Sequence, residues 1–121
     1  MMRVWVAAIV LLVAGTADSS KPDIPKYSQM MLLKNYAMAS CLGRAFPGSA
    51  LVPDANASAA GYIEHGSVSA DAYVEIVKLA DIFLARKYAS ISGQPLQTMK
   101  CIDLFHSEDL NRVVKRFTAK R

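Results

Sequence analysis

Apolar residues recur at intervals of three and four along most of the chain, a spacing that is typical of α-helices with one buried face. The first such segment runs from Tyr27 to Phe46, and Pro47-Gly48 ends it because proline cannot continue a helix. Residues 19–26, which contain two prolines, predict a short ordered lead-in or a loose arm. The expected core positions of the first helix are Met31, Leu32, Leu33, Tyr36, Ala39, Leu42 and Phe46.

A second helix is predicted from Pro53 to about His65, with Gly66 as its stop. Proline suits a first helical turn, because the N–H groups there have no partner within the helix. Gly61 lies inside this helix and costs about 1 kcal/mol relative to alanine. A neighbouring helix could approach closely along four alanines, Ala55, Ala57, Ala59 and Ala60.

The third predicted helix starts after Ser69, whose hydroxyl can accept a free amide hydrogen of the first turn, and continues to Tyr88. Residues 89–94, ASISGQ, break the helical period and predict a loop. The apolar stripe of this helix consists of Tyr73, Ile76, Val77, Ala80, Phe83, Leu84 and Tyr88.

Two shorter helices complete the pattern. One is predicted from Pro95 to Phe105, and Ser107 can cap the last helix, whose inner face carries Val113, Val114 and Phe117. No segment alternates between apolar and polar residues as a half-buried strand would. We therefore predict an all-α, single compact domain of about five helices over residues 18–121, with no internal repeat.

Residues 1–17 have the organisation of a secretory signal peptide. Arg3 supplies a positive charge, Val4–Val13 form an apolar run, and Gly15-Thr16-Ala17 offers small residues for a signal peptidase. A membrane helix needs about 20 apolar residues, so this run is too short to span a bilayer. We expect cleavage and export, which places the mature protein in the periplasm without stable membrane insertion. The alternative is an uncleaved N-terminal anchor.

The composition limits the function classes. A chain of 121 residues is one domain, and 53% hydrophobic with 20% charged residues is too apolar for a disordered protein. The formal net charge is +4, and a basic stretch near the C-terminus could contact nucleic acid or anionic lipid. A solvated helix face is the simpler interpretation, and export argues against a nucleic-acid partner. The basic residues are Arg112, Lys115, Arg116, Lys120 and Arg121.

Cys41 and Cys101 are the two cysteines of the exported part, 60 positions apart. An oxidising compartment makes them disulfide candidates, while two buried thiols, a metal site or a catalytic role stay open. Cys41 with His65 or His106 could act as nucleophile and base, and the four residues together are ligand types for zinc. Their spacings lack the short ligand pairs of structural zinc sites. We predict no catalytic residue, no cofactor and no metal, which favours a protein-binding module.

Three segments, residues 34–46, 74–88 and 99–117, together resemble one family, the type VI secretion amidase immunity proteins of the fourth amidase–immunity class. The most specific element is the run from Lys100 to Ser107, which fits the family pattern K-C-[LI]-D-L-[YF]-H-S. It is accompanied by Ala39-Ser40-Cys41 in the first helix and by Leu84–Tyr88 at the end of the long helix. The resemblance covers about residues 27–117.

This resemblance implies an all-helical periplasmic protein that is not an enzyme and that forms a homodimer. Its partner would be a cognate peptidoglycan amidase, a papain-like Cys–His enzyme that cleaves the peptide stem between D-glutamate and diaminopimelate. The family also implies a disulfide between Cys41 and Cys101. Inhibition would come from a protruding loop, which precedes the K-C-x-D-L helix and enters the catalytic cleft of the amidase.

By position, that loop is residues 89–94 of this chain. Ile91 is its single large apolar residue and the expected anchor, while Ser90, Ser92, Gly93 and Gln94 would supply further contacts. Ile91 could instead pack back onto its own domain. Two other classes of protein also stay open: an exported helical binding or membrane-surface module without an amidase partner, and a small enzyme that uses a cysteine or a histidine.

Overall fold

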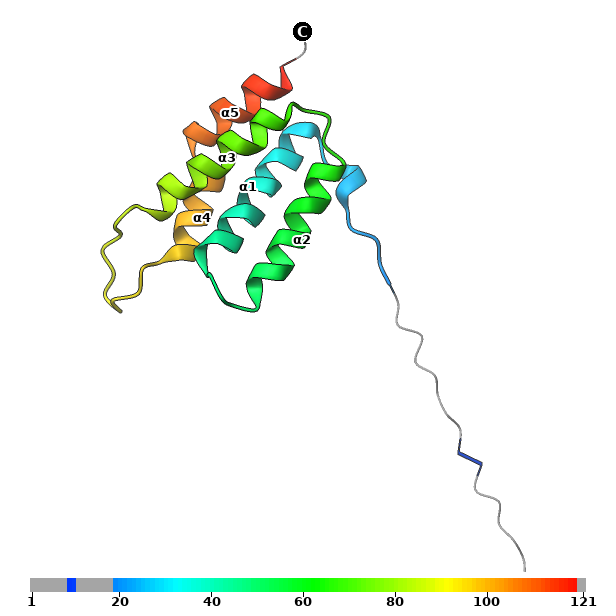
Figure 1. Ribbon diagram of the computed structural model, residues 1–121, viewed down its shortest axis with the longest axis horizontal. Helices are drawn as coiled ribbons and strands as arrows, with labels where there is room; N and C mark the ends of the chain where they lie inside the picture. Colours follow the sequence, from blue (N-terminus) through cyan, green and yellow to red (C-terminus); the bar gives the residue numbers. More distant parts are fainter. Residues whose placement is uncertain (1–8, 11–18, 120–121) are drawn as a thin grey trace, which may run out of the picture.

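Helix α1 lies at the centre of the fold and contacts each of the other four α-helices (Figure 1). The computed structural model describes residues 9–10 and 19–119. Apart from residues 9–10, the predicted signal peptide lies outside this part of the chain, as do Lys120 and Arg121. Within it, the all-α prediction is confirmed, since it contains helices and no strand. The elements are the 3₁₀-helix η1 (Ile24–Lys26) and the helices α1 (Gln29–Ala45), α2 (Leu51–Glu64), α3 (Ala70–Leu84), α4 (Gln97–Phe105) and α5 (Glu108–Thr118).

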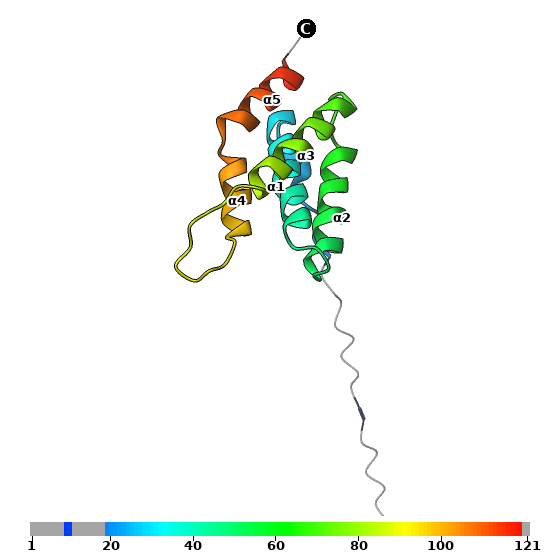
Figure 2. The ribbon, with the colours of Figure 1, turned by 60° about the vertical axis from the view of Figure 1, so that its left-hand side comes forward.

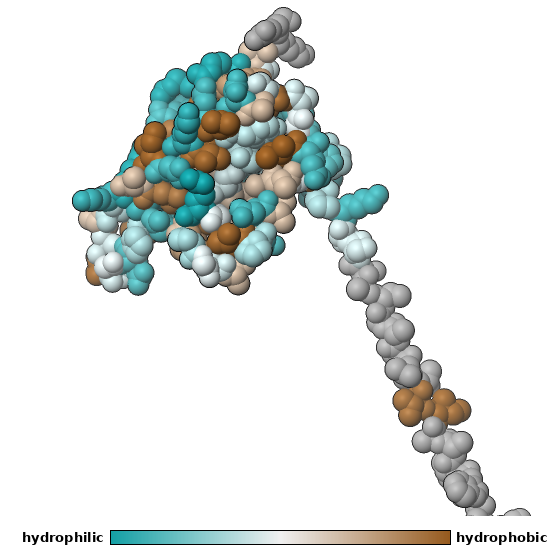
Figure 3. Space-filling model, in the orientation of Figure 1, coloured by the Kyte–Doolittle hydropathy of each residue, from teal (hydrophilic) through white to brown (hydrophobic). Residues whose placement is uncertain are grey.

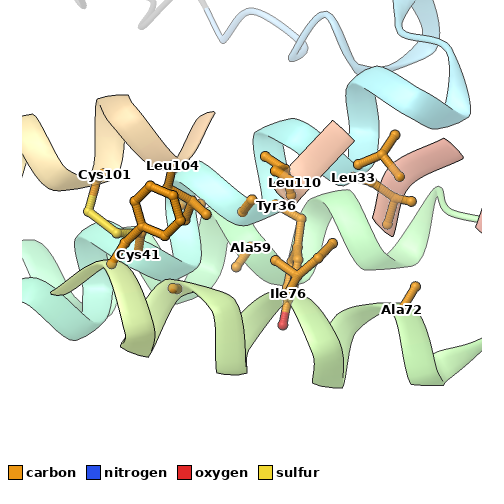
Figure 4. Close-up of a cluster of buried hydrophobic side chains, with 14 of the residues drawn as sticks. Leu33, Tyr36, Cys41, Ala59, Ala72, Ile76, Cys101, Leu104 and Leu110 are labelled. Atoms are coloured by element: carbon orange, nitrogen blue, oxygen red, sulfur yellow. A yellow bond between two sulfur atoms is a disulfide. The ribbon is translucent and has the colours of Figure 1, made fainter. Parts of the chain in front are cut away.

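Helix α2 turns back beside α1, whereas α3, α4 and α5 pack against α1 away from α2 (Figures 1 and 2). Helix α3 packs on α1, α4 and α5, so the three C-terminal helices contact one another as well as α1. The buried side chains come from all five helices and meet in one cluster (Figure 4). The largest fully buried ones are Phe83, Leu33, Ile76, Leu104, Leu110 and Val114.

Small residues bring α1 and α2 together. A Cβ atom added at Gly43 of α1 would lie 3.3 Å from the Cβ of Ala55 and 3.0 Å from Oδ1 of Asn56. Ala55 and Ala59 are buried at this contact, whereas Ala57 and Ala60 are exposed. The prediction of close approach along α2 is therefore correct for two of its four alanines, because the other two lie on the solvent side.

Three of the predicted helix starts need correction. Helix α1 begins at Gln29 rather than Tyr27, because the hydroxyl of Ser28 caps it by accepting a hydrogen bond from the Met31 amide, at 3.2 Å. Helix α2 begins two residues before Pro53, which is allowed because the first four N–H groups of a helix need no partner within it. Helix α4 begins at Gln97 rather than Pro95.

The exposed charges join neighbouring helices. The Arg44 guanidinium on α1 donates two hydrogen bonds of 2.6 Å to the Asp81 carboxylate on α3, which lowers the pKa of Asp81 below 3.8. On α5, Arg116 pairs with Glu75 of α3. The pairing of Arg116, which is exposed, agrees with the interpretation of the described part of the basic stretch as a solvated helix face. No helix between residues 19 and 119 is long and apolar enough to cross a membrane.

Replacing Ser107 by alanine is expected to destabilise the fold by about 1 kcal/mol. The Ser107 hydroxyl accepts a hydrogen bond from the Leu110 amide at 3.1 Å, and it donates one to the Leu104 carbonyl at 2.8 Å, so it links α4 to α5. Urea unfolding measures the change. Ser58→Ala is the matched control, since the exposed Ser58 lies inside α2, where alanine is favoured. Equal losses in the two variants would contradict a capping role.

Candidate functional site

The loop of residues 85–96 between α3 and α4 projects away from the helices, and both ribbon views show it standing clear of the domain (Figures 1 and 2). It includes all of residues 89–94, the loop predicted from the sequence, and extends beyond that segment at both ends. A loop of this length can reach further from the core than one of six residues, because the chain advances at most about 3.5 Å for each residue.

The third helix ends at Leu84, so the prediction that it continues to Tyr88 is wrong. The amide of Arg86 turns back to the Phe83 carbonyl at 3.1 Å, which tightens the last turn. The Leu84 carbonyl accepts a hydrogen bond of 3.2 Å from the Lys100 ammonium on α4. A side chain from another helix thus supplies the hydrogen bond that a terminal carbonyl of α3 lacks within its own helix.

Hydrogen bonds within the tip of the loop give it a defined shape. The Gly93 amide donates to the Ser90 carbonyl at 3.3 Å, and the hydroxyl groups of Ser90 and Ser92 are 3.0 Å apart. The Gln94 amide donates to the Ser92 hydroxyl at 3.3 Å. Gly93 has φ +76°, a left-handed conformation that glycine adopts without strain. The four serine, glycine and glutamine residues predicted as contacts therefore form one turn.

Ile91 lies at this turn with a relative exposure of 111%, so it does not pack onto its own domain. Ser92, Gly93 and Gln94 are also exposed, and Ser90 is half-buried. A fully exposed isoleucine contributes no hydrophobic stabilisation to the fold, because that contribution comes from burial. The structure thus presents the predicted anchor residue to solvent on the loop between α3 and α4.

Apolar side chains also surround the base of the loop, and the sequence analysis did not single them out. Met99 and Ile102 of α4 are 50% and 45% exposed, and with Phe46, Pro95 and Leu96 they line a shallow hollow. Met99 and Ile102 are three residues apart and lie on the side of α4 opposite the buried Cys101 and Leu104. Helix α4 therefore has apolar side chains on two faces. That pattern was the available signal.

A second exposed apolar surface lies on α3. Val74 and Ile82 are 53% and 61% exposed, and Figure 3 shows hydrophobic side chains among hydrophilic ones on the face that α3 turns toward the viewer. Leu79 and Val113 help to line the adjoining groove between α3 and α5.

The two cysteines form a disulfide, with an S–S distance of 2.10 Å and a Cα–Cα distance of 5.6 Å (Figure 4). Both residues are fully buried. Cys41 therefore has no thiol to serve as a nucleophile, and neither cysteine can bind zinc in this state. Over residues 9–10 and 19–119, no three side chains of histidine, cysteine, aspartate or glutamate form a group that could hold a metal ion.

The fold and the loop define a class of protein: a small, disulfide-linked helical domain that presents one preformed loop. Comparison with known families gives a match, over residues 31–114, to the family described as Tai4, type VI secretion system (T6SS) amidase immunity protein. A chain from the Tae4/Tai4 effector–immunity system of Salmonella typhimurium is 36% identical, with a TM-score of 0.78, and the match covers 84% of this chain and 100% of that one.

Two further solved structures support the fold. A chain from the Tae4–Tai4 effector–immunity complex of Enterobacter cloacae is 24% identical, with a TM-score of 0.69 and coverage of 79% of this chain and 98% of that one. A chain from a structure described as new type VI-secreted toxins and self-resistance proteins in Serratia marcescens is 20% identical, with a TM-score of 0.74. The match covers 88% of this chain and 90% of that one. Comparison with curated proteins gives no match. The chain belongs to the Tai4 family of T6SS amidase immunity proteins.

Proposed function

We propose that this protein is an immunity protein that binds and inhibits a cognate type VI-secreted peptidoglycan amidase. Membership of the family supports this function, and the relatives from Salmonella typhimurium and Enterobacter cloacae come from Tae4–Tai4 effector–immunity structures. The observation that carries the proposal is the projecting loop 85–96, with Ile91 fully exposed at a hydrogen-bonded tip. A loop that is ordered by its own hydrogen bonds loses less conformational entropy on binding than a disordered one.

The proposed mechanism is occlusion of the amidase cleft. Ile91 would enter an apolar part of the cleft, and Ser90, Ser92, Gly93 and Gln94 would offer hydrogen-bonding groups around it. The substrate would then lose access to the catalytic cysteine of the amidase without any chemistry by the inhibitor. We accordingly propose that the protein has no catalytic activity of its own.

The proposed location is the periplasm, reached through the signal peptide at residues 1–17. The buried disulfide supports export, because disulfides persist in oxidising compartments. Intact-mass measurement of protein purified from a periplasmic extract tests the cleavage. The expected mass is that of a chain that begins at Asp18, and retention of residues 1–17 would contradict the proposal.

A homodimer is also part of the proposal, as the family resemblance implies. The exposed Val74 and Ile82 on α3 and the apolar hollow beside Met99 offer surfaces that a second copy or the amidase could cover. Sedimentation equilibrium of the mature protein tests the dimer, with a mass of twice the monomer as the expected result.

An inhibition titration tests the central claim. The mature protein, beginning at Asp18, is added in steps to the amidase encoded beside it while cleavage of peptidoglycan fragments is followed. Loss of activity at a stoichiometric ratio, together with co-elution of the two proteins, is the expected result. If the amidase stays fully active at a tenfold excess and the proteins elute separately, the immunity function for that amidase is wrong.

A further inference from the structure

Lys100 is a buried charged residue at the base of loop 85–96. Its side chain is 4% exposed, although lysine is almost never buried without partners. The Nζ atom donates to the Leu84 carbonyl at 3.2 Å and to Oε1 of Gln97 at 2.8 Å. It also lies 5.6 Å from the centroid of the Tyr88 ring, within the range of a cation–π interaction.

These partners belong to both ends of the loop. Leu84 is the last residue of α3, Tyr88 lies in the outgoing part of the loop, and Gln97 is the first residue of α4. One ammonium group thus ties together the two helices from which the loop emerges. Its positive charge also faces the C-terminus of α3, where the helix dipole favours a cation.

Tyr88 makes a second connection to α4. Its hydroxyl donates a hydrogen bond to Oδ2 of Asp103, one helical turn after Lys100. This hydrogen bond raises the pKa of Tyr88. A phenol is protonated at neutral pH in any case, so the Tyr88 hydroxyl is the donor. The outgoing part of the loop is therefore held at Leu84 by Lys100 and at Tyr88 by Asp103.

The returning part of the loop is restrained in a different way. Leu96 precedes α4 with φ +55° and ψ +43°, a left-handed conformation that is unfavourable for a leucine. Its carbonyl accepts a hydrogen bond of 3.1 Å from the Lys100 amide. Such a conformation persists only where the surrounding structure fixes it.

The core does not require a charge at position 100. Cys101 and Leu104 supply the buried apolar contacts of α4, and the disulfide fixes this helix to α1. Lys100 and Asp103 lie on either side of Cys101 in the chain and both reach toward the loop. Their contacts therefore determine the position of the loop more than the packing of the domain.

We propose that Lys100, Tyr88 and Asp103 form a clamp that fixes the base of loop 85–96 and so orients Ile91 for its protein partner. The three are positioning residues that act through the loop. The inference rests on the proposed function only for its partner, the amidase, because the clamp is a property of the free protein. A clamped loop spends more time in the orientation that can bind, which raises the rate of association.

Lys100→Met tests the clamp, because methionine keeps the apolar stem and removes the three donors. Native-state hydrogen exchange of the free protein is expected to be about tenfold faster at the backbone amides of Arg86 and of residue 100, with the amides of α1 unchanged. The association rate with the amidase, measured by surface plasmon resonance, is expected to fall about tenfold, with less change in dissociation. Tyr88→Phe, which removes only the hydroxyl, is expected to shift both quantities in the same direction by a smaller factor.

Lys115→Met is the matched control, since it removes the same charge from an exposed position on α5. It should leave both measurements at the wild-type values. Unchanged exchange at the backbone amides of Arg86 and of residue 100 in both clamp variants would overturn the proposal. Faster exchange in every helix would also overturn it, because Lys100 would then stabilise the whole domain. If the wild-type protein does not bind the amidase, the proposed function fails, and the exchange result still decides whether the clamp exists.

Discussion

Replacing Ile91 by aspartate is expected to weaken inhibition of the amidase by about 30-fold or more. An anchor residue at the centre of an interface contributes about 2 kcal/mol or more, and each 1.4 kcal/mol is a factor of ten in affinity. Aspartate also places a charge where an apolar pocket of the amidase is proposed, at a further desolvation cost. The melting temperature should stay within about 2 °C of the wild type, because Ile91 is fully exposed and packs against nothing in its own domain.

Two further variants separate the causes. Ile91→Ala removes the side chain without adding a charge, and most of the loss in inhibition should persist. Met30→Asp adds the same charge at an exposed apolar residue in the first turn of α1, where the helix dipole tolerates an anion, so it should inhibit like the wild type. The titration of peptidoglycan cleavage measures all three. Full inhibition by Ile91→Asp, or an equal loss of binding and melting temperature, would contradict the anchor role.

Removing the disulfide by the double substitution Cys41→Ala and Cys101→Ala is expected to destabilise the protein by about 4 kcal/mol. The bridge closes a loop with a sequence separation of 60, and the chain-entropy model assigns about this value to a loop of that length. For a domain of this size, the loss corresponds to a fall of roughly 20 °C in melting temperature. Thermal unfolding followed by circular dichroism at 222 nm measures it.

Reduction of the wild-type protein provides the comparison for this variant. It should lower the melting temperature by a similar amount, and the double variant should not respond to the reductant. Both cysteines are fully buried in the contact between α1 and α4. In the double variant, removal of the two sulfur atoms therefore leaves a small cavity, which adds to the entropic effect. A fall of less than about 5 °C in the double variant would mean that the surrounding core, rather than the bridge, holds α4 in place.

The helices were predictable because their signals are local. The period of the apolar residues and the capping residues Ser69 and Ser107 act within one or two turns, and the structure has helices that begin next to both. The end of α3 was not predictable in this way. Its apolar stripe continues to Tyr88, but the helix stops at Leu84 where Lys100, 16 residues further along the chain, reaches the terminal carbonyl.

The candidate site was predicted in part. The break in periodicity at residues 89–94 located the middle of the loop but not its ends, and composition alone indicated Ile91 as its apolar residue. Neither signal could show whether Ile91 is packed or exposed, since both states have the same sequence pattern. The exposed Met99 and Ile102 were missed for a related reason: a helix with apolar residues on two faces does not indicate which face the core covers.

The sequence by itself determined the helical class, the approximate helix positions and the family resemblance, all of which depend on residue types at short or fixed spacings. It also offered the cysteine pair, while the tertiary structure brought the two sulfur atoms together. Only the tertiary structure decided the length of the loop, the exposure of Ile91 and the burial of Lys100. These features depend on contacts between α3 and α4, whose relative placement follows from packing around α1. Such long-range contacts leave no periodic trace in the sequence, because each requires only a single suitable side chain.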